Sequence, residues 1–287
     1  MLVKEYENAR DYLKDQEENL LKHEAVSQLV LFEAYLNQGV EQKERGLFGI
    51  VMEEGAPLLH FCNVMPHNMA VYAQGTGKDV IGPAASLLAD YMASNHIPFH
   101  GINAKLELCL PFMDQYKKSV NCTFLEKVSS DIMEVRELND IKPVEGKHRL
   151  AEPEEVKLVT DWMINYQIEA LASEINYEKA LNKATRFIQE NKLYIYEDTE
   201  AMPVSMAVAS RQLKNGVAIN YVYTPEECRG KGYAAANIYY MSKELLEQGN
   251  QFCTLFVDRK NPISTRAYEK VGYRILEDNY EYLLLQS

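Results

Sequence analysis

Apolar positions recur at two different periods along the 287-residue chain, and each period predicts a type of element. Apolar residues spaced three and four apart indicate helices, whereas short β-branched or aromatic runs indicate strands. In the first half we expect helices over 4–20, 22–38, 83–95 and 105–118, and strands over 47–53, 58–64, 68–73 and 97–102, with one or two more over 121–138. Pro83 suits the first position of its helix.

The second half has a similar order of elements. The pattern predicts helices over 153–171, 178–190, 234–247 and 262–271, strands over 148–152, 193–198, 203–213, 217–224 and 252–258, and a terminal hairpin over 273–285. Both halves therefore contain two helices, an antiparallel meander, and a strand–helix–strand–helix–strand tail. This is a duplication of element order and not of residues.

The polar stretch 138–148 contains Pro143 and Gly146 between two periodic segments, so we expect the domain boundary there. The predicted domains are residues 1–146 and 147–287. Two domains also agree with the usual size of about 100–200 residues per domain.

The net charge and its distribution limit the classes of ligand that the chain is expected to bind. The net charge of −12 argues against general nucleic-acid binding. Residues 1–146 carry −9 of it (13 Lys/Arg, 22 Asp/Glu) and residues 147–287 carry −3 (17 and 20), which leaves an anionic ligand plausible in the second half. The acidic surface suits a cationic co-substrate or is a solvated acidic face.

Targeting signals and cysteine motifs are not evident. No apolar run approaches the roughly 20 residues of a membrane span, and the N-terminus lacks a signal-peptide pattern, so we expect a cytoplasmic protein without a membrane partner. The five cysteines are scattered without C-x-x-C spacing. We therefore expect reduced thiols and no metal site.

The most informative stretch is "YTPEECRGKGYAAAN", where a glycine-punctuated basic loop leads into a predicted helix. The first amides of a helix lack intrahelical partners and lie at the positive end of its dipole. Gly230 and Gly232 remove Cβ atoms that would hold an anion away, while Arg229 and Lys231 add charge. These features predict a phosphate cradle, although an ordinary turn with a solvated basic loop has the same local signature. The spacing fits neither a Walker A loop nor G-x-G-x-x-G.

The same stretch resembles motif A of the GNAT acyltransferase superfamily, a strand followed by [QR]-x-x-G-x-[GA]. Arg229, Gly232 and Ala234 fill its three fixed positions. Downstream, "LFVDRKNPISTRAYEKVGYRI" resembles motif B of that family, and the two motifs come in the right order with a helix between them. The resemblance covers about 147–287 and implies an α+β fold of two tandem GNAT-like domains, each with a central mixed, mostly antiparallel sheet flanked by helices.

The resemblance also implies a site and a reaction. The reaction is transfer of an acetyl group from acetyl-CoA to an amine acceptor by direct attack in a ternary complex. Tyr268 is expected to act as the general acid that protonates the departing thiolate. The backbone amide near Val222 is expected to stabilise the oxyanion. The coenzyme A-binding positions are Val222, Tyr223, Thr224, Arg229, Gly230, Lys231, Gly232, Tyr233, Ala234, Asn261 and Ser264, of which Asn261 also suits a helix cap.

The first half is similar to the N-terminal domain of a two-domain bacterial subgroup of this family, through "MPHNMAV" and "IPFHGINAKLELCLPFMDQYKK". Its Gln74, Gly75 and Gly77 superficially resemble the loop. However, Asp79 occupies a position where Gly or Ala is required and would repel a diphosphate. We therefore expect a degenerate GNAT-like domain that binds no coenzyme A.

Several features stay open at this level. Some family members use a Glu on the strand before the loop as base, but this strand has Asn220 and Tyr221. Glu169 and Glu174 are alternative bases or surface residues, His148 is expected to be structural, and a water relay is the default. A small amine, an amino acid, an antibiotic, or a protein N-terminus or lysine could each be the acceptor. An acyl-CoA sensor without turnover and an interaction module remain alternatives, and the oligomeric state is unreadable.

Overall fold

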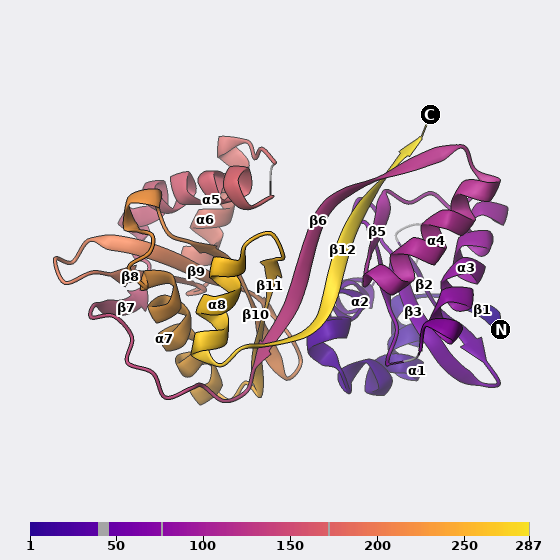
Figure 1. Cartoon of the computed structure of the whole chain (residues 1–287), viewed down its shortest axis with the longest axis horizontal. Coiled ribbons are helices and arrows are strands. Elements are labelled where there is room, and N and C mark those ends of the chain that lie inside the picture. Colours follow the sequence, from indigo (N-terminus) through magenta and orange to yellow (C-terminus); the bar gives the residue numbers. More distant parts are fainter. Residues whose placement is uncertain (40–45, 76, 172, 287) are drawn as a thin grey trace. The chain divides into compact units, whose positions relative to one another are not determined.

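The computed structural model describes residues 1–39, 46–75, 77–171 and 173–286, and its chain divides into two compact units (Figure 1). The first unit comprises Met1–Asp131 with Glu277–Ser287, and the second comprises Ile132–Leu276. The C-terminal segment therefore returns to the first unit.

The first unit is a sheet with helices on both faces. Its strands lie in the order β1-β2-β3-β4-β5-β12-β6, and only β4 and β5 among the pairs recorded within it are parallel. One apolar core joins α3 and α4 to the sheet, and another joins α1 and α2 to it. The elements are β1 (Leu2–Tyr6), α1 (Ala9–Leu21), α2 (Glu24–Asn37), β2 (Leu47–Glu53), β3 (Ala56–Asn63), β4 (Met69–Tyr72), α3 (Lys78–Ser94), β5 (Gly101–Ala104), α4 (Leu106–Ser119) and β6 (Cys122–Val135).

The second unit repeats this plan. Its strands lie in the order β6-β11-β10-β9-β8-β7, with β10 and β11 parallel. One core packs α7 and α8 on the sheet, and a second packs α5 and α6 on it. The elements are β7 (Lys147–Leu150), η2 (Pro153–Glu155), α5 (Val156–Leu171), α6 (Tyr177–Gln189), β8 (Leu193–Glu197), β9 (Pro203–Gln212), β10 (Gly216–Tyr223), η3 (Glu226–Cys228), α7 (Tyr233–Glu247), β11 (Phe252–Asp258) and α8 (Pro262–Val271). Strand β12 (Arg274–Gln286) begins in this unit and continues into the first. The predicted tandem architecture of mixed, mostly antiparallel sheets with flanking helices is confirmed.

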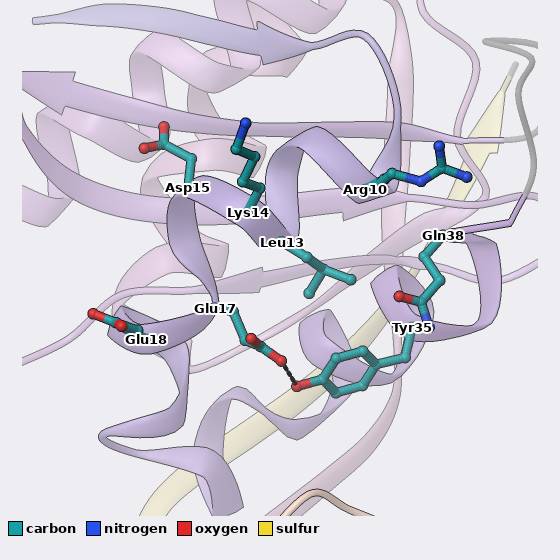
Figure 2. A pocket seen from close by; sticks show the side chains of 8 residues that line it. All are labelled: Arg10, Leu13, Lys14, Asp15, Glu17, Glu18, Tyr35 and Gln38. Carbon is teal, nitrogen blue, oxygen red and sulfur yellow. Dashed lines mark hydrogen bonds between the residues drawn. The ribbon is translucent and has the colours of Figure 1, made fainter.

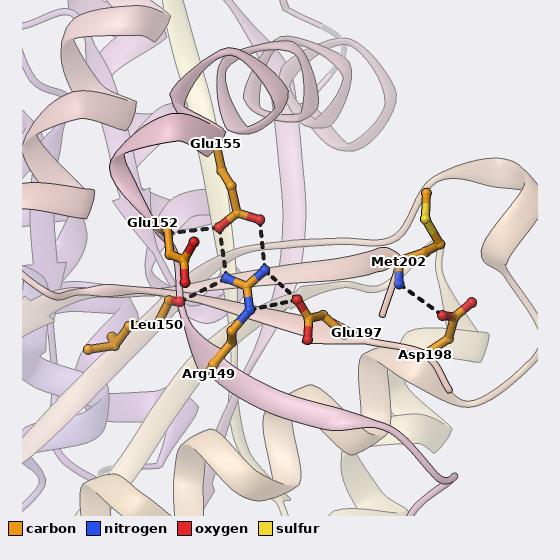
Figure 3. A network of polar contacts seen from close by, with 7 residues as sticks. All are labelled: Arg149, Leu150, Glu152, Glu155, Glu197, Asp198 and Met202. Carbon is orange, nitrogen blue, oxygen red and sulfur yellow. Dashed lines mark hydrogen bonds and ion pairs between the residues drawn. The ribbon is translucent and has the colours of Figure 1, made fainter. Parts of the chain in front are cut away.

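A half-buried ion network precedes α5 (Figure 3). The Arg149 guanidinium makes a bidentate pair with Glu155 at 2.8 and 2.9 Å, and its Nε donates to Glu197 at 2.7 Å. These contacts raise the pKa of Arg149 and lower that of Glu155. Glu155 also accepts the Glu152 amide at 2.8 Å and so forms a capping box before α5. The network therefore positions the N-terminus of α5, the helix whose last turn lies beside the candidate site.

Three local predictions were wrong. Leu2–Tyr6 is a strand because it pairs with β2 from Leu2↔Met52 to Tyr6↔Phe48, a partner that local periodicity does not reveal. Helix α3 begins at Lys78 and includes Pro83 in its interior. The expected C-terminal hairpin is one strand, because residues 280–283 pair with β5 and carry the chain straight on.

The compact units also differ from the expected boundary. Residues 132–146 belong to the second unit, because the polar stretch expected to be a linker packs on that unit. The Asn139 amide donates to the Val271 carbonyl at 2.9 Å, and the Tyr196 hydroxyl donates to the Val144 carbonyl at 2.6 Å. Proline and glycine correctly mark an irregular segment, but they do not show which of the two units that segment packs on.

Candidate active site

The loop that leads into α7 is built on two glycines in the left-handed region. Gly230 has φ of +76° and Gly232 has φ of +91°. A Cβ at Gly230 would meet nothing within 4 Å, and one at Gly232 would only touch Val144 at 3.9 Å. Backbone conformation, and not lack of space, therefore requires glycine here. The space beside both residues is open, as an anion cradle needs.

The first turn of α7 presents backbone amides without intrahelical partners. Gly232 is the N-cap and makes no side-chain capping bond, and the first bond of the helix runs from the Ala236 amide to the Gly232 carbonyl at 3.0 Å. The backbone amides of Tyr233, Ala234 and Ala235 come before the first bonded amide of the helix. They therefore lie at the positive end of the helix dipole. Lys231 is exposed beside them. This turn can hold a dianionic group.

Arg229 lies in the loop but is held from two sides. Its Nε donates to the Thr224 carbonyl at 2.9 Å, and its Nη2 pairs with Glu169 of α5. The guanidinium also lies 5.8 Å from the ring centre of Tyr223, whose hydroxyl donates to the other oxygen of Glu169 at 3.0 Å. The ion pair raises the pKa of Arg229. Arg229 therefore shapes the loop and links it to the last turn of α5.

Strands β10 and β11 separate next to this loop. Their parallel register runs from Gly216↔Phe252 to Ile219↔Leu255, while β10 continues to Tyr223 and β11 to Asp258. The recorded ladder thus ends before either strand does. Such a splay leaves backbone groups of β10 available to a ligand that binds as an extra strand.

The end of β10 places three of the expected residues in different surroundings. Val222 is half-buried against the α7–α8 core, and Tyr223 is buried in the α5–α6 core. The Tyr223 carbonyl accepts the Ser205 hydroxyl at 3.1 Å, and the Thr224 hydroxyl donates to the same Ser205 oxygen at 3.1 Å. The Tyr223 carbonyl therefore already has a protein partner.

Tyr268 lies on α8 with 7% of its surface exposed. Burial raises the pKa of its phenol, and the nearby phenol of Tyr166 raises it further. Tyr166 comes from α5, on the opposite face of the sheet, and its hydroxyl donates to Asn220 of β10 at 3.0 Å. The raised pKa keeps the Tyr268 phenol protonated at neutral pH, so its hydroxyl is available as a hydrogen-bond donor.

The two remaining helix positions from motif B are at the start of α8. Asn261 is the N-cap, and its Oδ1 accepts the Ser264 amide at 3.1 Å. Ser264 is half-buried. The cap expected for Asn261 is confirmed, and any ligand contact would be additional.

Tyr233 is at the first position of α7, and the centre of its ring lies 6.2 Å from that of Tyr196.

The candidate bases are placed as follows. Glu169 is bound to Arg229 and Tyr223, while Glu174 is exposed. The His148 side chain is 9% exposed and stacked against Tyr194 at 5.0 Å, and this partial burial lowers its pKa to about 4. His148 therefore has the surroundings of a packing residue. Sequence reasoning did not single out Tyr166, and it treated Asn220 only as the absence of a glutamate, because no local motif marks either residue.

A separate open hollow of about 440 Å³ lies between α1 and α2 of the first unit (Figure 2). It mixes Arg10 and Lys14 with Asp15, Glu17 and Glu18. The Tyr35 hydroxyl donates to Glu17 at 2.7 Å. The opposing charges do not make an anion site of the kind found at α7.

A known protein family matches most of the second unit. Residues 157–273 match the model of the "Acetyltransferase (GNAT) family". The resemblance to the GNAT family is thereby confirmed for residues 157–273. No curated protein matches the chain significantly. The GNAT assignment supports an acetyl-CoA-dependent acetyltransferase, as the resemblance predicted.

Solved structures extend the likeness to the whole chain. A GNAT-family acetyltransferase from Colwellia psychrerythraea shares 11% identity over 100% of both chains with a TM-score of 0.57. A Drosophila protein shares 12% over 99% of this chain and 98% of its own, with a TM-score of 0.59. A GCN5-related N-acetyltransferase from Sphaerobacter thermophilus shares 14% over 90% and 84%, with a TM-score of 0.53. At these identities the likeness establishes the fold.

Within the described ranges, no group of three or more His, Cys, Asp or Glu side chains is arranged to hold a metal ion. Among the described helices, none combines the length and apolar character that crossing a bilayer requires. Four cysteines are buried and Cys228 is half-buried, all as free thiols.

Proposed function

We propose that the chain is an N-acetyltransferase that moves the acetyl group of acetyl-CoA to an amine acceptor within the second unit. The observation that carries this proposal is the uncapped first turn of α7, preceded by Gly230 and Gly232 at positive φ and adjacent to the splayed end of β10. A diphosphate binds well at such a turn. The family match supports the acetyl-CoA-dependent chemistry.

Coenzyme A would contact three parts of the unit. The amides from Gly230 to Ala234, with Lys231 and Arg229 beside them, would hold the diphosphate. The backbone of Val222, Tyr223 and Thr224 would pair with the pantetheine arm in the splay. Asn261 and Ser264 would border that arm at the start of α8, and Tyr233 would lie beside the diphosphate at the first position of α7.

The reaction would proceed by direct attack of the amine on the thioester carbonyl. The C–N bond forms and the C–S bond breaks, while the Val222 amide stabilises the charge on the carbonyl oxygen, a contribution of about 3 kcal/mol for a well-placed donor. Tyr268 would give its proton to the departing thiolate. The amine would lose its proton to a water relay, because Glu169 is engaged by Arg229 and Tyr223.

The first unit would bind no coenzyme A. The corresponding splay lies between the ends of β4 and β5, and there the Lys105 Nζ donates to the Ala73 carbonyl at 3.2 Å and pairs with Glu277 at 3.0 Å. Lys105 is 8% exposed, so this contact occupies backbone that a pantetheine arm would need. Asp79 in the first turn of α3 would also repel a diphosphate. These contacts support a first unit without a coenzyme A site.

The test is a thiol-release assay with acetyl-CoA and the full chain over small amines, amino acids, aminoglycoside-type amines, and peptides with a free N-terminus or lysine. The expected result is thiol release that depends on one amine class, with an equal amount of acetylated product by mass spectrometry. Binding without turnover on any class would identify an acyl-CoA sensor. Absence of binding would reject the proposal.

A further inference from the structure

Tyr221 adopts an unusual backbone conformation at the end of β10. Its φ is +51°, which costs a non-glycine residue roughly 1–2 kcal/mol. It sits in a bulge, because the register with β9 passes from Asn220↔Val208 to Tyr223↔Met206. Three steps along β10 thus match two along β9. A residue stays in such a conformation only where its surroundings hold it.

The Asn220 side chain supplies the local restraint. Its Oδ1 accepts the backbone amide of Tyr221 at 2.8 Å and the hydroxyl of Tyr166 at 3.0 Å. The backbone amide of Tyr221 can only donate, so it fixes the oxygen end of the Asn220 carboxamide towards the bulge, and the Tyr166 hydroxyl donates to that same oxygen. One oxygen thereby joins the bulge to α5, a helix on the face opposite α7 and α8.

The Tyr221 side chain is restrained as well. Its ring lies 5.2 Å from that of Tyr166 and 6.0 Å from that of Phe187. Its hydroxyl accepts a hydrogen bond from Lys183 at 3.2 Å. The bulge is therefore held by two helices, α5 and α6, which pack on the same face of the sheet.

The residue that follows the bulge is the expected oxyanion donor. Among the strand pairings recorded for the described residues, neither Tyr221 nor Val222 has a partner. The pairing of β10 with β9 passes from Asn220 directly to Tyr223, and its pairing with β11 ends at Ile219. The direction of the Val222 amide is consequently set by the bulge and not by a ladder. Any motion at Tyr221 would turn that amide away from a carbonyl in the splay.

We propose that Tyr166 and Asn220 are positioning residues, which lock the Tyr221 bulge and thereby aim the Val222 amide at the acyl carbonyl. This inference rests on the proposed acetyl transfer. The Asn220 oxygen accepts both bonds, so removing the Tyr166 hydroxyl or the Asn220 carboxamide should release the same restraint on Tyr221. Tyr166 and Asn220 therefore act as one unit.

Three variants test the inference: Tyr166→Phe, Asn220→Leu and the double variant. Each single change should lower kcat about tenfold while the KM for acetyl-CoA stays within twofold, because a misdirected oxyanion donor weakens transition-state binding. The double variant should be no slower than the worse single variant, because coupled residues are not additive. The matched control is Tyr239→Phe, a partly buried α7 tyrosine packed on the α7–α8 core, which should keep wild-type kcat.

A second measurement does not depend on turnover. The Tyr221 amide should exchange with deuterium about tenfold faster in Asn220→Leu than in the wild type, as expected for loss of one hydrogen bond of about 1.4 kcal/mol. Unchanged exchange, or an active wild type whose two variants retain full kcat, would overturn the positioning role and leave the proposed function standing. A wild type without turnover but with faster exchange in the variant would instead sink the proposed function.

Discussion

The Arg229 Nε donates to the backbone carbonyl of Thr224 at 2.9 Å, and this bond closes the loop between β10 and α7. The same guanidinium pairs with Glu169, so one side chain both shapes the loop and ties it to α5. Arginine can do this because its nitrogens are arranged in a rigid fork, which lysine lacks. The loop is therefore preorganised before any ligand arrives.

The first prediction follows from that fork. Arg229→Lys keeps the charge but loses the Thr224 bond, and should raise the acetyl-CoA dissociation constant about fivefold to tenfold, equivalent to about 1–1.4 kcal/mol. Isothermal titration measures it. Arg266→Lys, at an exposed position on α8, is the control and should bind like the wild type. Equal affinity in both variants would show that charge alone matters at Arg229.

Gly232 and Gly249 provide a matched pair at the two ends of α7. Both have positive φ, of +91° and +100°, and a Cβ at either would meet no atom closer than 3.9 Å. Alanine at either position should therefore cost similar stability, about 1–2 kcal/mol from the backbone conformation. Only Gly232→Ala should weaken acetyl-CoA binding, by about tenfold, because only that end presents free amides. Urea denaturation and titration separate the two effects, and equal binding losses would refute the cradle.

Tyr268→Phe tests the acid. The variant removes only the hydroxyl, and should lower kcat at least about tenfold while acetyl-CoA affinity is retained. Burial raises the pKa of this phenol, so the wild-type kcat should show no loss from its deprotonation as pH rises to 9. A variant with unchanged kcat at saturating substrates would remove Tyr268 from the mechanism.

Buried histidines should govern acid stability. The pKa of His60 in the first unit and of His148 in the second is lowered from 6.5 to about 4 by burial. The unfolded chain therefore takes up protons more readily, and stability should fall as pH drops from about 6.5 towards 4. At pH 5 the loss is about 2 kcal/mol for each histidine.

The measurement is urea denaturation of the wild type and of His148→Phe at pH 7 and pH 5. The variant should lose less stability between these values than the wild type does. His100→Gln, at an exposed side chain, should retain the full pH dependence. An unchanged pH dependence in His148→Phe would mean that other groups cause the acid sensitivity.

Local patterns predicted most of the elements and the loop of the candidate site. The α7 loop was readable because strand, glycines, charge and helix follow one another within a few residues, and α7 indeed begins at Tyr233, next to the expected start. Helix α8 was likewise marked by Asn261 and Pro262 at its N-terminus.

Features that depend on distant partners were not readable. A terminal hairpin was expected over 273–285, yet Glu277 within it pairs with Lys105, and the strand continues along β5. The Tyr166 bond to Asn220 joins a helix to a strand bulge, and neither residue stands in a recognisable motif. Such contacts arise from packing and cannot be read from a local window.

The most direct test of the central claim is a crystal structure of the full chain with acetyl-CoA. We predict one molecule per chain, with diphosphate oxygens within about 2.7–3.2 Å of backbone nitrogens between Gly230 and Ala235 and with the thioester in the splay beside Val222. A diphosphate bound elsewhere, or a second molecule at the Lys105 end of the first unit, would contradict the account.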